Sequence, residues 1–163
     1  MAEDILIRED LGPITRLTLN TPGTLNALSD AMLARLRAEF GALMEDTGQR
    51  VIILRGAGKA FCAGHDLKEI ARKREAEDKG AVALRDLFSR CSEVMQMIRR
   101  LPQPVIAQVH GIATAAGCQL VASCDLAVAA DETRFGVNGV NIGLFCSTPM
   151  VALSRNIPRK QAF

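Results

Sequence analysis

Aromatic residues are scarce in this chain, which has no tryptophan, no tyrosine and six phenylalanines among its 163 residues. Proteins that hold single-stranded nucleic acid stack its bases on aromatic side chains, so this scarcity argues against such a partner. The charge agrees, because 20 lysines and arginines against 18 acids leave a net charge of only +2. We therefore expect neither a nucleic-acid partner nor a basic patch that binds membranes.

Motifs for metal binding and disulfide chemistry are also missing. Two histidines, His65 and His110, are too few for a histidine-rich metal site, and no Cys-x-x-Cys pair occurs. The five cysteines are irregularly spaced, which indicates buried thiols in a reducing compartment rather than a disulfide framework. They are Cys62, Cys91, Cys118, Cys124 and Cys146. We expect no metal.

Long apolar segments are absent too. No apolar run is long enough to cross a bilayer, and the acidic start MAEDILIRED has no hydrophobic signal region. These two absences predict no membrane partner and a cytoplasmic location. A length of 163 residues with 48% hydrophobic content suffices for a substantial core, so residues 1–163 are expected to form a single domain.

Short β-branched runs predict the strands. Two strands are expected between residues 5 and 20, joined by a turn at Leu11-Gly12-Pro13. Three further runs, VIILRG, PVIAQVHG and LAVAA, are typical of strands buried on both faces, as in parallel sheets.

Apolar residues at helical spacing predict the helices between these strands. We expect helices from residues 29–30, from about Asp66, over residues 81–100, from about Gly117 and from residues 147–148. Because strands alternate with helices, the chain is predicted to be an α/β domain with a parallel sheet.

The stretch GAGKAFCAGHDL, residues 56–67, raises the question of phosphate binding. A Walker A loop needs serine or threonine after its Gly-Lys pair, but alanine follows Gly58-Lys59. The dinucleotide pattern GxGxxG fails as well, because Phe61 stands where its third glycine belongs. Nucleotide binding is therefore not favoured.

Backbone N–H groups offer this loop another use. The loop turns at residues 63–64 and enters a predicted helix, so its N–H groups lie in a positive potential without intrahelical acceptors. The stretch VHGIATAAGCQL, residues 109–120, has the same design, and the small side chains of Ala115 and Ala116 permit close approach. Two such N–H groups that converge on one oxygen would form an oxyanion hole, in which one donor is worth about 2.7–4 kcal/mol.

Several blocks of the sequence resemble the enoyl-CoA hydratase/isomerase (crotonase) family: LNALS, VIILRGAGKAFCAGHDLKEI, PVIAQVHGIATAAGCQLVASCDLAVAADETRFG and GLFCSTP. One branch of the family is most similar, through GHDLKE, ATAAGCQLVASCD and GLFCSTP. The resemblance implies a crotonase-like superhelix of ββα units that lacks the family's C-terminal helical region, so that apolar surface is left exposed. It also implies fatty acid metabolism, a coenzyme A thioester as substrate rather than a bound cofactor, and a homotrimer or hexamer.

The same resemblance implies roles for individual residues. The oxyanion donors would be the peptide N–H groups of His65 and Ala116. The two glutamates that activate water in the family's hydratases are replaced by Gln119 and Gly139. Residues that would contact coenzyme A are Leu25, Ala63, His65, Asp66 and Leu67. Because glutamine and glycine cannot accept a proton, hydration should be impaired, since acid–base catalysis typically contributes 10²–10⁴-fold.

Other side chains could replace the lost acids. His65 titrates near neutrality and is the sharpest candidate, although it can equally be a partly exposed loop histidine. Cys118 is either activated at the start of a helix or packed against the sheet.

Three functional hypotheses remain open. The chain is a lyase or isomerase acting on acyl-CoA by altered chemistry, such as isomerisation, decarboxylation or thioester hydrolysis. Alternatively, it is a non-catalytic acyl-CoA-binding or regulatory subunit. A small redox or nucleotide-binding domain is the least favoured, because the motifs for both are missing.

Overall fold

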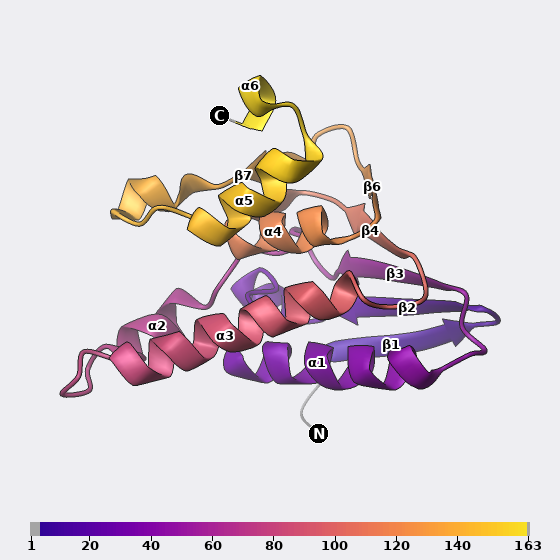
Figure 1. Cartoon of the computed structure of the whole chain (residues 1–163), viewed down its shortest axis with the longest axis horizontal. Coiled ribbons are helices and arrows are strands. Elements are labelled where there is room, and N and C mark those ends of the chain that lie inside the picture. Colours follow the sequence, from indigo (N-terminus) through magenta and orange to yellow (C-terminus); the bar gives the residue numbers. More distant parts are fainter. Residues whose placement is uncertain (1–3, 163) are drawn as a thin grey trace.

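A five-stranded sheet forms the frame of the molecule (Figure 1). The computed structural model describes residues 4–162, and its sheet has the strand order β1-β2-β3-β4-β6. The strands are β1 (Leu6–Leu11), β2 (Ile14–Leu19), β3 (Val51–Gly56), β4 (Val105–Val109) and β6 (Leu126–Ala129). Only β1 and β2 are antiparallel, and every later neighbour is parallel. The predicted α/β domain with a parallel sheet is confirmed.

The helices stack along one side of this sheet. In Figure 1, α1, α3, α4 and α5 follow one another from the N-terminal to the C-terminal end of the molecule. The helices are α1 (Asp30–Glu45), α2 (Leu67–Lys73), α3 (Ala81–Ile98), α4 (Ala116–Ser123), α5 (Ser147–Asn156) and α6 (Arg159–Ala162), with short 3₁₀ turns η1 (Pro22–Thr24) and η2 (Asn138–Ile142). Each predicted helix start lies within one residue of the observed one.

Helix α1 begins where its sequence predicts, because Ser29 accepts a hydrogen bond from the Met32 N–H at 3.1 Å. Its apolar face is buried, with Leu36 and Phe40 fully inaccessible to solvent. This face and that of α3 pack against leucines of the sheet such as Leu17. The core therefore lies between the helices and strands β1–β4.

A second, two-stranded sheet includes residues 112–114, for which only a turn before a helix was expected. It pairs β5 (Ile112–Thr114) with β7 (Arg134–Gly136) in parallel. Two isolated bridges, Leu28 with His65 and Cys62 with Ala113, extend this pairing. These contacts place three separate loops side by side.

The prediction of a buried strand at LAVAA is wrong. All four residues of β6 are exposed, Leu126 by 62% and Val128 by 63%. The reason is that strand side chains point alternately to the two faces of the sheet, and among the described residues neither face of this edge strand is covered. Further apolar side chains are exposed nearby in sequence, at Val140, Ile142 and Phe145.

Candidate functional site

The loop after β3 is fixed by the backbone of two neighbouring segments. The Cys62 carbonyl accepts a hydrogen bond from the Thr114 N–H at 3.0 Å, which aligns the loop with β5. On its other side, the Ala63 N–H donates to the Leu25 carbonyl at 3.0 Å. The Gly64 carbonyl accepts from the Leu28 N–H at 2.7 Å. The loop therefore runs between the Leu25–Leu28 segment and β5, and it brings the predicted residues Leu25 and Ala63 together.

Asn26 is a site-forming residue that the sequence reasoning missed. Its side chain is fully buried and accepts a hydrogen bond from the Thr21 N–H at 2.9 Å. Its amide donates to the carbonyls of Ala57 and Ala60, both at 2.8 Å. The available signal was an asparagine between apolar residues in LNAL, where a buried amide needs several partners.

The second loop enters α4 through an unusual backbone conformation. Ala115, the N-cap of α4, has φ 50° and ψ −121°, in a region that L residues seldom adopt. Its N–H donates to the Gly136 carbonyl at 2.8 Å, which ties the loop to β7. Ala116 is the first residue of the helix, so its N–H has no intrahelical acceptor.

The two loops touch at Gly64. A Cβ atom added there would lie 3.0 Å from the Thr114 carbonyl oxygen and 3.2 Å from the Ala116 nitrogen. A Cβ atom at Gly117 would collide with the carbonyl of Cys62. Because His65 follows Gly64 directly, its peptide nitrogen lies within roughly 6–7 Å of the Ala116 nitrogen. The structure thus brings His65 and Ala116 together across two loops that are far apart in sequence.

The imidazole of His65 is half-buried and packs edge-on against Phe88 of α3, with ring centroids 5.3 Å apart. Its Nδ1 atom is buried and has no hydrogen-bond partner among residues 4–162. Burial lowers the pKa of His65 below its ordinary value of 6.5, against the opposing effects of the Leu28 backbone and Asp30. The ring is therefore a neutral group at physiological pH, and its intermediate exposure is compatible with the partly exposed loop histidine that was considered.

Asp66 and Leu67 mark the start of α2. The Asp66 carboxylate caps this helix by accepting hydrogen bonds from the N–H groups of Lys68 and Glu69, at 2.8 and 3.2 Å. Both hydrogen bonds use the Oδ1 atom, so one carboxylate oxygen is engaged in capping. Leu67 is 58% exposed and lies beside it on the surface.

Gln119 lies on α4, one turn after Ala116, and lines a cavity of about 890 Å³ between α3, α4 and α5. Its side chain is buried, and its Oε1 accepts a hydrogen bond from the Thr148 hydroxyl at 3.1 Å. An amide at this position cannot act as a base. It can donate a hydrogen bond through its NH₂ group to whatever occupies the cavity.

Gly139 has no room for a side chain. A Cβ atom there would lie 2.5 Å from the Leu144 carbonyl oxygen and 2.6 Å from the Cys146 sulfur. The neighbouring Asn138 accepts a hydrogen bond from the Thr114 hydroxyl at 2.6 Å, which joins this segment to the second loop. Gly139 is therefore a packing residue here, and a glutamate cannot take its place unless the segment shifts.

The cysteines are packed thiols in the structure. Burial raises the pKa of Cys62 and Cys124 to about 12 and that of Cys91 to about 11. Burial also raises the pKa of Cys118, so it is not activated by its position in α4. The structure therefore supports a packed Cys118 rather than one activated at the start of a helix.

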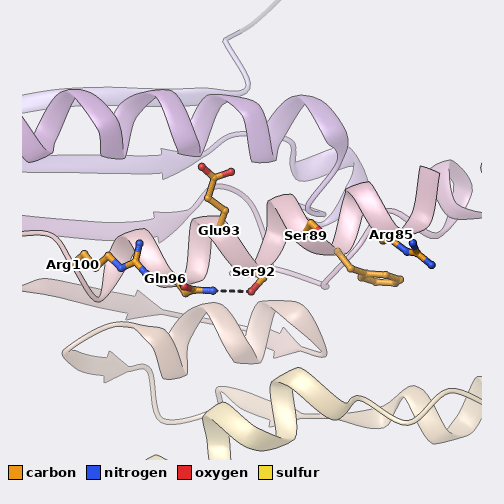
Figure 2. Close-up of a pocket in the computed structure, with 7 residues that line it drawn as sticks. Arg85, Ser89, Ser92, Glu93, Gln96 and Arg100 are labelled. Atoms are coloured by element: carbon orange, nitrogen blue, oxygen red, sulfur yellow. Dashed lines mark hydrogen bonds between the residues drawn. The ribbon is translucent and has the colours of Figure 1, made fainter. Parts of the chain in front are cut away.

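A shallower groove of about 560 Å³ follows the exposed side of α3. Figure 2 shows its polar lining, in which Gln96 donates a hydrogen bond to the Ser92 hydroxyl at 3.1 Å. Glu93 forms an ion pair with Arg37 of α1 at 2.8 Å. These groups satisfy one another, and the groove contains none of the predicted site residues.

A metal-binding cluster and a membrane-spanning helix are both absent from the described part of the chain. Within residues 4–162, no three or more histidine, cysteine, aspartate or glutamate side chains are grouped so as to hold a metal ion. In the same residues, no helix combines the length and the apolar character needed to cross a membrane.

Comparison with known proteins identifies the same family that the sequence motifs resemble. The family model described as "Enoyl-CoA hydratase/isomerase" matches residues 10–163. A crystal structure of an enoyl-CoA hydratase from Mycobacterium smegmatis is 57% identical with a TM-score of 0.91, over 99% of this chain and 61% of that chain. The structure of human enoyl-CoA hydratase domain-containing protein 3 is 46% identical with a TM-score of 0.89, over 98% of this chain and 61% of the other.

Among curated proteins, the mouse "Enoyl-CoA hydratase domain-containing protein 3, mitochondrial" is 50% identical over 149 residues, which are 91% of this chain and 48% of the relative. The chain thus spans about half the length of the curated relatives it matches. The mouse relative belongs to the branch of the family that the motifs GHDLKE, ATAAGCQLVASCD and GLFCSTP indicated. Its name places it in mitochondria, which contradicts the cytoplasmic location expected from the N-terminal sequence. The absence of a hydrophobic signal region and of a membrane-spanning run does not distinguish the cytoplasm from mitochondria.

Proposed function

The chain belongs to the enoyl-CoA hydratase/isomerase family, and from this premise we propose that it binds acyl-CoA thioesters in a backbone oxyanion hole. The peptide N–H groups of His65 and Ala116 donate to the thioester oxygen. The observation that carries the proposal is the contact of the two loops at Gly64. Neither of the two N–H groups has a protein acceptor among the described residues. Each donor of this kind contributes about 2.7–4 kcal/mol to stabilising a developing enolate.

The coenzyme A portion follows the first loop in this proposal. Leu25 and Ala63, joined by their backbone hydrogen bond, form one wall of its channel. Asp66 and Leu67 lie at its outer end, where the Asp66 carboxylate also caps α2. We also propose a homotrimer or hexamer, which is consistent with the exposed apolar residues of β6.

Hydration of a 2-enoyl-CoA is slow in this proposal. Gln119 offers an amide where a base is needed, and the space beside Gly139 is filled by Leu144 and Cys146. Loss of acid–base catalysis lowers the rate by about 10²–10⁴-fold. Reactions that depend chiefly on a polarised carbonyl, such as isomerisation, decarboxylation or thioester hydrolysis, fit the site better. The filled space beside Gly139 also favours a second candidate function, that of a non-catalytic acyl-CoA binder.

Calorimetry with acetyl-CoA, run beside a crotonyl-CoA hydration assay, tests the proposal. We expect binding together with hydration at least about 100-fold below that of an ordinary hydratase. Gln119→Glu is the informative variant, because a glutamate fits there more readily than at position 139. Failure to bind acetyl-CoA would contradict the oxyanion hole, and hydration at ordinary enzyme rates would contradict the role given to Gln119. Binding without turnover of any thioester would identify the non-catalytic binder.

A further inference from the structure

The cavity behind Gln119 carries charges that the proposed oxyanion hole does not use. It lies between α3, α4 and α5 and has a volume of about 890 Å³. Its charged lining consists of Arg99 at the end of α3, Arg155 in the last turn of α5, and Asp125 after α4. Met95 and Val151 contribute apolar surface beside them. The cavity is thus large enough for an acyl group and mixed in character.

Neither arginine has an ionic partner among residues 4–162. The ion pairs found among residues 4–162 involve other cations, and neither Arg99 nor Arg155 makes a side-chain hydrogen bond there. Asp125 is the one carboxylate of the lining, and its Oδ2 accepts a hydrogen bond from the Val105 N–H at 2.8 Å. The lining therefore has an excess of one positive charge.

Gln119 adds a neutral donor to these cations. Because its Oε1 accepts from the Thr148 hydroxyl at 3.1 Å, its NH₂ group is the part left to face the cavity. Gln119 is also one helical turn from Ala116, so the cavity begins next to the proposed position of the thioester carbonyl. A wholly apolar acyl chain in this cavity would leave the NH₂ group of the buried Gln119 without a hydrogen-bond partner, which is unfavourable.

We propose that this cavity receives an acyl group with a carboxylate at its far end, and that Arg99 and Arg155 are the ionic partners of that carboxylate. The proposal rests on the proposed function, because it takes the acyl group to be that of a bound thioester. Arginine suits this role, since its planar guanidinium pairs with a carboxylate through two parallel hydrogen bonds. Met95 and Val151 then contact the methylene groups between the two ends.

The test compares two thioesters of equal carbon number, pentanedioyl-CoA and pentanoyl-CoA, by calorimetry on the full chain. We expect the dicarboxylic thioester to bind at least about tenfold more tightly to the wild-type protein. The double variant Arg99→Gln/Arg155→Gln should bring this ratio to about one, chiefly because it binds pentanedioyl-CoA more weakly. Both arginines are exposed, so the variant should fold, which circular dichroism checks.

Arg100→Gln is the matched control. Arg100 follows Arg99 in sequence but lines the groove of Figure 2, where it donates to the Gln96 side chain at 3.1 Å. This variant should keep the wild-type preference.

Four outcomes overturn the inference. Equal affinity of the wild-type protein for the two thioesters, or a preference that survives loss of both arginines, rejects it and leaves the proposed function intact. Binding of free pentanedioate with the same dependence on the arginines identifies a general anion site instead of an acyl subsite. Failure of both thioesters to bind rejects the proposed function and this inference with it.

Discussion

Single buried polar side chains hold the loops of the site in position. Asn26 shows this best, because one amide satisfies the Thr21 N–H and the carbonyls of Ala57 and Ala60. Asn26→Ala leaves these three groups without their partner, and we expect a loss of about 2–4 kcal/mol in the free energy of unfolding. Urea denaturation measures it.

Asn20→Ala is the control for Asn26→Ala. The Asn20 side chain makes one exposed hydrogen bond, to the Asp4 carbonyl at 2.9 Å, so its removal should cost less than about 1 kcal/mol. Equal losses for the two variants would show that Asn26 does not fix the loop.

His65 makes stability depend on pH. Its pKa in the folded chain is lowered by burial, so below its ordinary value of 6.5 the unfolded chain binds a proton that the folded chain does not. The contribution of His65 to the free energy of unfolding is therefore fully present above pH 6.5, and it decreases as the pH falls below 6.5. Urea midpoints at pH 7.5 and 5.5 should differ more for the wild-type protein than for His65→Gln. The same difference in both proteins would exclude His65 as the cause.

At the scale of elements, the start of α4 stores backbone strain. Ala115 has φ 50°, a conformation that costs a non-glycine residue about 1–3 kcal/mol. Ala115→Gly should therefore stabilise the protein by about 1 kcal/mol, because glycine adopts positive φ without a steric penalty. Thermal denaturation measures the shift. Ala38→Gly in the middle of α1 is the control, and it should destabilise by about 0.5–1 kcal/mol. Destabilisation by both variants would contradict the strain at Ala115.

Elements with a local signal were predictable from the sequence. Helix α1 carries its own cap in Ser29 and its own apolar face, and both are local properties of the chain. The conformation of β5 depends instead on Cys62 and β7, which are distant in sequence. Its own residues therefore predicted only a turn. The burial of β6 was mispredicted for a related reason, because an apolar run does not reveal whether other elements will cover the two faces of the strand.

The site was partly predictable for the same reason. Backbone N–H groups beside small residues pointed to the two loops, and the family resemblance pointed to His65 and Ala116 within them. The structure brings these loops into contact at Gly64. The roles of Asn26 and Gly139 depend on atoms supplied by other segments, such as the Leu144 carbonyl. The spacing of residues along the chain does not predict those contacts.

At the scale of the whole molecule, β6 offers a surface for association. It is an edge strand with unpaired backbone groups on one side and with Leu126 and Val128 exposed. Such edges pair with other chains unless a charge interrupts them. Val128→Lys should therefore reduce concentration-dependent association in analytical ultracentrifugation.

Val82→Lys is the control for that experiment. Val82 is equally apolar and is exposed on α3, away from the sheet edge, so its replacement should leave association unchanged. If Val128→Lys associates like the wild-type protein, β6 is not the contact surface.

The central claim is that two peptide amides, from loops 50 residues apart in sequence, hold one thioester oxygen. A crystal structure of the chain with bound acetyl-CoA measures this directly. The account predicts that the thioester oxygen lies about 2.7–3.1 Å from both the His65 and the Ala116 nitrogen. A bound thioester whose oxygen contacts neither nitrogen, or only one of them, would contradict it.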